Sequence, residues 1–277
     1  MKHPCPNGSE ACAESLSESL LQQLEKMALK FHILPATIDD AEALLACALK
    51  ANAGDKLMRA FYPPERAHLT PPEQLQEHRM RRMRARFTDE NVWQKAVLDD
   101  DPNVIVGYSA WTMPKSQRAP KKQDEGEEED AGDEKCTPPA CVDFELQRLF
   151  EKECEAHSEK AMPMDSWRKP RSIIRTHPTQ LTVFDSLDLQ GLSVCPEYQR
   201  KGVGSALLRH MLQRVDQDGL PAYMEATADG AKLYPHFGFE TRERMDVFPR
   251  SHPLHHTMAF MVRPARGTTE RRQVSAA

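Results

Sequence analysis

The sequence predicts an α/β fold, and three observations support this prediction. Apolar residues recur at helical spacing within 41–49. Aromatic and β-branched residues mark two strands, at 92–98 and 104–113, which a short polar loop joins into a hairpin. A third strand, at 187–194, runs through a glycine-containing turn into another helix.

The composition limits the classes of protein to consider. The chain has 277 residues, a net charge of −5 and 39% hydrophobic residues, enough for one large domain or two small ones. The low apolar fraction predicts polar tails or an insertion. No apolar run approaches the ~20 residues of a membrane-spanning helix, and the N-terminus lacks the apolar stretch of a secretory signal. We therefore expect no membrane partner, and the near-neutral charge does not favour nucleic acid.

The cysteines indicate a reducing compartment. There are seven, an odd number at low density, which is typical of free thiols in the cytoplasm or nucleus. Cys136 and Cys141 lack a histidine at zinc-finger spacing, so no metal site is expected. The histidines at 252, 255 and 256 lie in a proline-containing segment and predict a loop.

The N-terminal part begins with an extension over residues 1–28. A strand is expected over 31–38, and Asp39 or Asp40 can cap the helix at 41–49.

A second helix is predicted from Pro72 to about Phe87, because proline suits the first helical turn. It carries arginines at 79, 81, 82, 84 and 86. We interpret them as a solvated face. The alternatives are a nucleic-acid patch or a weak, salt-sensitive contact with an acidic segment further along the chain.

Residues 114–180 interrupt the pattern of strands and helices. Eight of the twelve residues in 123–134 are Asp or Glu, and such a run repels itself. A helical pattern follows over 142–154. We predict a disordered acidic insertion near 115–140 within the domain.

The strand at 187–194 changes phase at a glycine. Leu187 and Leu189 are apolar at odd positions, whereas after Gly191 the apolar residues Leu192 and Val194 are at even positions. A shift of one residue at a glycine predicts a β-bulge. A bulge splays the strand from its neighbour and opens a slot where a ligand can hydrogen-bond to the backbone.

The turn after this strand has the features of an anion-binding site. Gly202 and Gly204 let the backbone approach a phosphate, and the N–H groups of the following helix point toward it. Arg200 and Lys201 add positive charge. Neither the dinucleotide-binding fingerprint nor the P-loop pattern is present.

Two motifs resemble those of one family. Gln-x-x-Gly-x-Gly at 199–204, after a Val-x-Pro strand end, resembles motif A of the GCN5-related N-acetyltransferases (the GNAT superfamily). Leu-Tyr-Pro-His-Phe-Gly-Phe at 233–239 resembles the same family's L-Y-x-x-x-G-F motif. Their order and spacing also match, so the chain resembles a small, fungal-type GNAT-domain protein. We place the domain at 29–265 and a flexible tail at 266–277.

The resemblance implies a mixed, mostly antiparallel sheet, flanked by helices and splayed between its fourth and fifth strands. It also implies acetyl-CoA as the donor, with no metal. The pantetheine would pair with the backbone of Leu192, Ser193 and Val194, and the acetyl group would lie between this strand and Ala222–Thr227. Thr227 stands where the family often has asparagine. The residues implied to hold the pyrophosphate are Gln199, Arg200, Lys201, Gly202, Val203, Gly204 and Ser205.

The resemblance implies catalytic roles as well. Tyr234 matches the tyrosine often assigned as the acid for the leaving thiolate; the alternative is that it packs against the cofactor. Asp188 matches the position of a catalytic glutamate in histone-acetylating members, or is a strand carboxylate paired with an arginine. Glu225 is a second candidate base, or an anchor for the substrate amine.

The function expected from this resemblance is N-acetyl transfer from acetyl-CoA by direct attack in a ternary complex. The expected acceptor is a small primary amine, followed by a protein lysine or N-terminus. The alternative is a non-catalytic acyl-CoA-binding sensor or scaffold of the same fold.

Overall fold

The computed structural model describes residues 29–114, 117, 138–162, 186–248 and 255–266. The strands are β1 Phe31–Pro35, β2 Asn91–Leu98, β3 Ile105–Thr112, β4 Leu187–Val194, β5 Ala222–Thr227, β6 Glu240–Asp246 and β7 Thr257–Arg263. The α-helices are α2 Ala41–Ala51, α3 Lys56–Phe61, α4 Pro72–Ala85, α5 Phe144–Ala161 and α7 Val203–Asp218. Short 3-10 helices are η1 Ile38–Asp40, η2 Pro64–Leu69, η4 Pro196–Tyr198, η5 Gly230–Lys232 and η6 Tyr234–Phe237.

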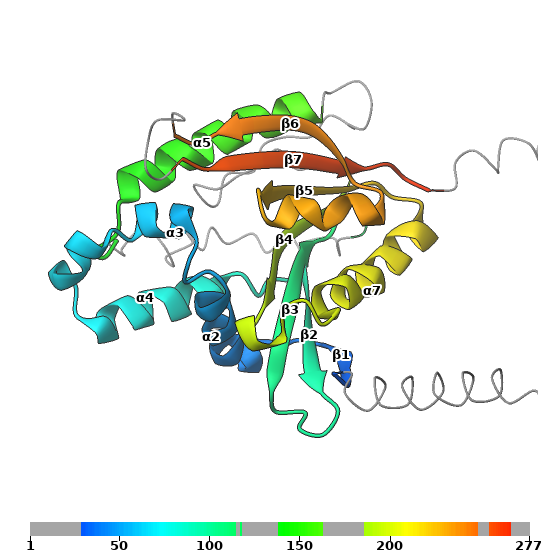
Figure 1. Ribbon diagram of the computed structural model, residues 1–277, viewed down its shortest axis with the longest axis horizontal. Coiled ribbons are helices and arrows are strands. Elements are labelled where there is room, and N and C mark those ends of the chain that lie inside the picture. Colours follow the sequence, from blue (N-terminus) through cyan, green and yellow to red (C-terminus); the bar gives the residue numbers. More distant parts are fainter. Residues whose placement is uncertain (1–28, 115–116, 118–137, 163–185, 249–254, 267–277) are drawn as a thin grey trace, which may run out of the picture.

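The strands form one seven-stranded sheet in the order β1-β2-β3-β4-β5-β7-β6 (Figure 1). Neighbouring strands are antiparallel except β4 and β5, which are parallel. The predicted fold class, a mixed and mostly antiparallel sheet flanked by helices, is therefore confirmed.

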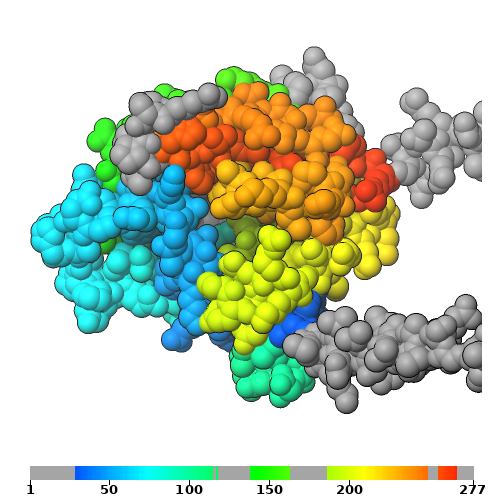
Figure 2. Space-filling view, in the orientation of Figure 1, coloured from blue at the N-terminus to red at the C-terminus, as the bar shows by residue number. Residues whose placement is uncertain are grey.

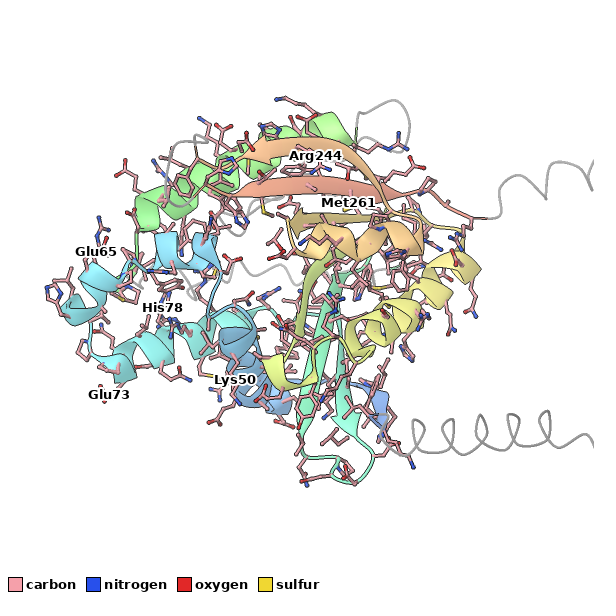
Figure 3. All side chains as sticks on the ribbon, viewed as in Figure 1. Lys50, Glu65, Glu73, His78, Arg244 and Met261 are labelled. Carbon is pink, nitrogen blue, oxygen red and sulfur yellow. The ribbon has the colours of Figure 1, made fainter. Side chains whose placement is uncertain are left out.

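Helices cover both faces of the sheet. On one face, α7 packs on a core that includes Trp111, Leu187 and Met224. On the other face, α2 and α4 cover the β2–β4 half around Trp93, and α5 runs along β6 and β7 around Phe260 (Figure 1). Figure 3 places Glu65, Glu73 and His78 on the η2–α4 segment, at the end of the molecule away from α7.

The first strand is shorter than predicted. It ends at Pro35, because Thr37 opens a 3-10 turn in which its N–H donates to Asp40 Oδ2 at 2.9 Å. Asp40 therefore does not cap α2 through its side chain; its other oxygen accepts from Lys95 Nζ at 2.6 Å. The sequence analysis missed α3, whose first turn is capped by Asp55 accepting from the Met58 N–H at 2.9 Å.

The helix predicted after the acidic run is longer than expected. The helical pattern at 142–154 is confirmed, but α5 continues to Ala161 and buries Cys154 and Ala161 against β6 and β7. Cys141 and Val142 are also buried, so the chain has rejoined the fold before α5 begins. The acidic run at 123–134 lies outside the described residues, so the insertion near 115–140 stays a prediction.

Several other predictions concern segments at the edges of the described chain. The extension at 1–28 and the tail after Arg266 lie outside it, as does His252. His255 and His256 lie in irregular chain before β7, as predicted. The four cysteines within the described ranges are free and buried. In these ranges no helix is long and apolar enough to cross a membrane.

Gly107 allows β3 to approach β4 closely, and replacing it should destabilise the fold. A Cβ there would lie 2.9 Å from the Ser193 carbonyl oxygen and 3.1 Å from Val203 Cγ1. We expect Gly107→Ala to lower the free energy of unfolding by about 1–3 kcal/mol, measured by urea denaturation. Gly54→Ala is the matched control, because nothing lies within 4 Å of its added Cβ. An equal loss in both variants would contradict this explanation.

Candidate active site

The centre of the site is the point where β4 and β5 separate. The two strands pair only from Leu187–Ala222 to Leu189–Met224. Beyond Leu189, β4 continues to pair with β3 as far as Val194. The backbone of β4 past this point therefore has a strand partner on the β3 side and, among the described residues, none on the β5 side. We call this separation of the two strands the β4–β5 gap, and it is the predicted splay.

A bulge lies at the start of this separation. Ala110 pairs with Gly191 and the next residue, Trp111, pairs with Leu189, so Gln190 is the extra residue on β4. This confirms the β-bulge predicted at Gly191. A bulge bends and twists its strand, which accounts for β4 leaving β5 at this position.

The turn after β4 has the backbone of an anion-binding loop. Arg200 and Gly202 both have positive φ, 62° and 87°. The first intrahelical bond of α7 runs from the Ala206 N–H to the Gly202 carbonyl at 2.9 Å. The N–H groups of Val203, Gly204 and Ser205 precede this bond, so they are the orphan donors of the helix N-terminus.

The side chains around this loop hold it in shape. Val203 is buried and anchors the start of α7 in the core. The Gln199 side-chain amide donates to the Val194 carbonyl at 3.1 Å, which ties the loop back to the end of β4. Lys201 lies over the ring of Tyr198 at 5.6 Å. Gln199 thus shapes the turn, and the exposed Arg200 and Lys201 remain the predicted sources of positive charge.

A cavity of about 440 Å³ adjoins this loop between α7 and η6, and its lining includes Ser205, Arg209 and Arg266. Arg263 also lines it, but its guanidinium is held by Asp216 at 2.7 and 2.8 Å and by the Phe237 carbonyl at 2.8 Å. The cavity is therefore basic, since Arg209 and Arg266 add charge that this ion pair does not neutralise.

Tyr234 lies on the α7 side of the gap. It is buried, and its ring packs edge-to-face with Phe239 at 6.0 Å. Burial raises the pKa of Tyr234 to about 12, so its hydroxyl keeps its proton at neutral pH. A Cβ added at Gly230 would lie 3.6 Å from this hydroxyl. The hydroxyl oxygen of Thr227 accepts from the Gly230 N–H at 3.3 Å, which shapes the turn before Tyr234.

The two predicted carboxylates lie on the opposite side of the sheet. Asp188 is buried and accepts a hydrogen bond from the Ser186 hydroxyl at 2.6 Å. Glu225 accepts from the Tyr223 hydroxyl at 3.2 Å. Burial raises the pKa of Glu225, although hydrogen bonds from Tyr223 and the Cys154 thiol of α5 partly offset this effect. A raised carboxyl pKa suits a general base near neutral pH.

The predicted site residues therefore surround one gap from two sides. Asp188 pairs in register with Tyr223, and Glu225 is two residues further on, so all three project to the face covered by α5. Tyr234 belongs to the core beneath α7. Tyr234 and the two carboxylates thus lie on opposite faces of the sheet, and the loop at 199–205 follows the end of β4.

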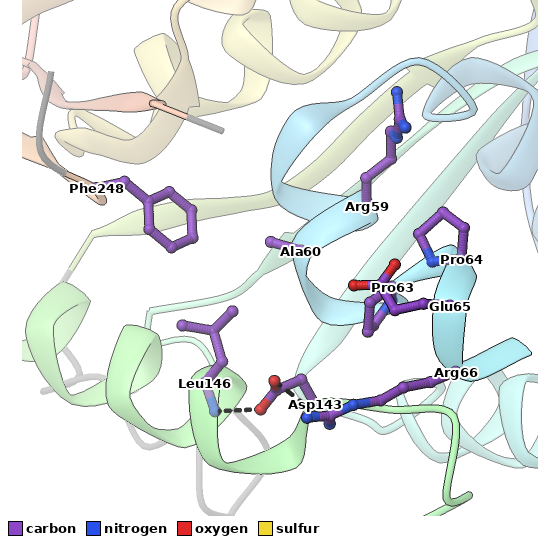
Figure 4. Close-up of a pocket in the computed structure, with 9 residues that line it drawn as sticks. All are labelled: Arg59, Ala60, Pro63, Pro64, Glu65, Arg66, Asp143, Leu146 and Phe248. Atoms are coloured by element: carbon purple, nitrogen blue, oxygen red, sulfur yellow. Dashed lines mark hydrogen bonds and ion pairs between the residues drawn. The ribbon is translucent and has the colours of Figure 1, made fainter. Parts of the chain in front are cut away.

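The surface near these elements is hollowed. In the space-filling view the recess lies between the blue α2–α3 segment, the yellow α7 segment and the orange η5–η6 segment (Figure 2). A second cavity, of about 360 Å³, lies between α3, η2 and the start of α5 (Figure 4). Phe248 and Leu146 form its apolar side, and Arg59, Glu65 and Asp143 its polar side.

The sequence analysis missed several polar residues of the site. Ser186 and Tyr223 each lie two residues from a predicted carboxylate, and strand alternation could have indicated them. Cys154 could not be found in this way, because α5 is distant in sequence from β5. Arg86 was interpreted as part of a solvated face, which is wrong: its guanidinium lies over the Trp93 ring at 5.2 Å.

The comparison with known families agrees with the two sequence motifs. Residues 173–241 match the model of the acetyltransferase (GNAT) domain. This stretch is therefore similar to part of a GNAT domain. It contains the 199–204 loop, the split strands and the 233–239 motif, whereas the fungal-type subgroup stays a prediction.

Curated relatives match a short part of the chain. The [ribosomal protein bS18]-alanine N-acetyltransferase of Escherichia coli (strain K12) is 35% identical over 72 residues, which is 24% of this chain and 49% of that protein. The chain thus spans about half the length of the curated relatives it matches.

Solved structures resemble the chain over more of its length. One is a histone acetyltransferase HPA2 and related acetyltransferase from Corynebacterium glutamicum, with 18% identity, a TM-score of 0.49, and 87% and 99% of the two chains covered. The ribosomal-protein-S18-alanine N-acetyltransferase from Escherichia coli has 12% identity, a TM-score of 0.42, and coverage of 86% and 96%.

Glu225 should make stability fall as the pH rises. Because burial raises its pKa in the folded state, the native protein holds this proton to a higher pH than the unfolded chain does. The stabilisation is complete below the unfolded pKa of about 4.3 and is lost as the pH rises through the folded value. We expect Glu225→Gln to gain stability relative to the wild type between pH 5 and pH 8, measured by denaturant unfolding. Glu77→Gln, an exposed change on α4, should show no such trend.

Proposed function

We propose that this protein is an N-acetyltransferase that moves acetyl from acetyl-CoA to a primary amine within a ternary complex. The observation that carries the proposal is the β4–β5 gap, which begins at a bulge and ends at a helix N-terminus within the GNAT-matched segment. The 35% identical relative is by name an N-acetyltransferase, which supports the same class of reaction.

The loop and the gap would bind different parts of acetyl-CoA. The N–H groups of Val203, Gly204 and Ser205 would hold the pyrophosphate, with Arg200 and Lys201 nearby. The basic cavity beside Ser205 suits the remaining phosphate of the nucleotide end. The open backbone of Leu192–Val194 would hydrogen-bond to the pantetheine amides.

The residues on the two sides of the gap would move protons. Bound acetyl-CoA supplies the thioester carbon that the amine attacks. Glu225 or Asp188, directly or through water, would take a proton from the amine on the α5 side. Tyr234 would give its hydroxyl proton to the leaving thiolate on the α7 side. Burial raises the pKa of the Tyr234 hydroxyl, and the same apolar surroundings would raise the pKa of the leaving thiol. The high pKa of Tyr234 therefore does not by itself prevent this proton transfer.

Gly204 tests the phosphate loop. A carboxylate at this position would place negative charge and bulk among the orphan N–H groups, so Gly204→Glu should weaken acetyl-CoA binding by roughly 100-fold or more, measured by calorimetry. Gly204→Ala is the matched control, because its Cβ would meet Leu233, Val194 and Leu192 at ordinary distances of 3.7–3.8 Å. Unchanged affinity in Gly204→Glu would overturn the loop assignment.

A variant of Tyr234 tests whether the protein is an enzyme or the alternative, a non-catalytic acyl-CoA-binding sensor or scaffold. Removing the hydroxyl by Tyr234→Phe should lower the turnover number by roughly 100-fold while leaving acetyl-CoA affinity within about twofold. Product formation is measured by mass spectrometry of the acetylated amine, with affinity measured by calorimetry. Equal turnover in the two proteins would assign Tyr234 a packing role, and wild-type binding without turnover on any amine would favour the sensor.

A further inference from the structure

Arg86 reaches the bulge of β4 from the end of α4. It is the C-terminal cap of that helix, and its Nη2 donates to the Gln190 carbonyl at 3.2 Å. The guanidinium is also the nearest group to a Cβ added at Gly191, at 3.8 Å. Arg86 therefore contacts the extra residue that directs β4 away from β5.

Among the described residues, only the Gln190 carbonyl accepts a hydrogen bond from this guanidinium, which leaves donors for a ligand. Its other described contact is the face of Trp93, which uses none of its N–H groups. No ion pair between described residues includes Arg86. Burial and the neighbouring charge of Arg82 lower its pKa, with Tyr108 acting in the opposite direction. A desolvated cation without a carboxylate partner is costly, and an anion bound beside it would recover part of that cost.

Arg86 lies on the same face of the sheet as the two carboxylates. Trp93 and Tyr108 belong to the core beneath α2 and α4, and Tyr108 pairs in register with Ser193 of β4. Asp188 projects to this face as well, and it is two residues from Gln190, or about 7 Å along the strand. One face of the sheet therefore carries this cation with Asp188 near it along β4, and Glu225 lies on the same face in β5.

This arrangement has the charges that complement a small zwitterion. The carboxylates would attract an ammonium group, and the planar guanidinium binds a carboxylate through paired hydrogen bonds. We propose that Arg86 is a specificity-determining residue that binds the carboxylate of the acceptor, and that the acceptor is a free α-amino acid or a close analogue. The inference rests on the proposed function. In the covalent step the amine nitrogen bonds to the acetyl carbon, the C–S bond breaks, and the carboxylate is only held.

The test compares acceptors that differ only in this group. Wild-type protein with acetyl-CoA is given the free amino acids, their carboxamides, the corresponding decarboxylated amines and short peptides with the same N-terminal residue. Products are measured by mass spectrometry. We expect the free acids to be acetylated with the highest kcat/KM, and Arg86→Gln to lower that value by roughly 10- to 100-fold, mainly through KM. Arg86→Lys should recover part of the loss, because it keeps the charge without the fork of donors.

Two controls separate specificity from stability. Arg84→Gln alters an exposed arginine of the same helix and should leave the preference for acids unchanged. Calorimetry with acetyl-CoA and the melting temperature show whether each Arg86 variant is folded and loaded. If Arg86→Gln does not fold, the test compares the selectivity of Arg86→Lys alone with that of the wild type.

The outcomes distinguish this inference from the proposed function. Wild-type protein that binds acetyl-CoA but prefers carboxamides, amines or peptides, or acetylates none of the panel, overturns the role of Arg86 and leaves the donor assignment intact. Unchanged selectivity in an Arg86 variant also overturns the role of Arg86 in binding the acceptor, and would mean that this residue only supports the bulge. Failure of the wild type to bind acetyl-CoA overturns the proposed function itself.

Discussion

The parallel contact between β4 and β5 is the constraint on which the rest of the structure depends. Parallel strands need a long crossover, and here that crossover contains the phosphate-binding loop candidate and α7. The contact ends after Leu189 and Met224, but residues of α7 share one core with residues of β4, β5 and β7, which links the two halves of the sheet. Because the contact is short, the end of β4 has no partner among the described strands on the β5 side, and the proposed function places the ligand there.

The gap separates two chemically different environments. The side under α7 is apolar, and Tyr234 is buried there with its ring against Phe239. The side under α4 and α5 carries Arg86, Asp188 and Glu225, held by hydroxyl and carbonyl partners. A hydrophobic environment suits an acetyl group and a thiol that is protonated as it leaves, whereas a charged one suits a polar acceptor. The sheet itself keeps the two sets of groups apart.

Much of this structure could be predicted from local patterns in the sequence. The phase change at Gly191 predicted the bulge, and Pro72 marked the start of α4. The residues that were misjudged depend on contacts between distant segments. In the sequence nothing distinguishes Arg86 from its exposed neighbour Arg84, because the Gln190 carbonyl that Arg86 contacts is distant in the chain. The contact of Cys154 with Glu225 is equally distant in sequence. Asp40 was expected to cap a helix, but Lys95 of β2 and the N–H of Thr37 bind it instead.

The position of α5 in the chain has a consequence for folding during synthesis. The helix precedes β4, yet the strands that it covers, β6 and β7, are made last. Its apolar residues, among them Cys154 and Ala161, leave the ribosome before the surface that buries them exists. The second half of the sheet can close only when β7 emerges, so a nascent chain exposes this helix from the synthesis of Ala161 until that of Arg263. Chains that stall before β7 present an unpaired helix face and an open strand edge, both of which invite aggregation.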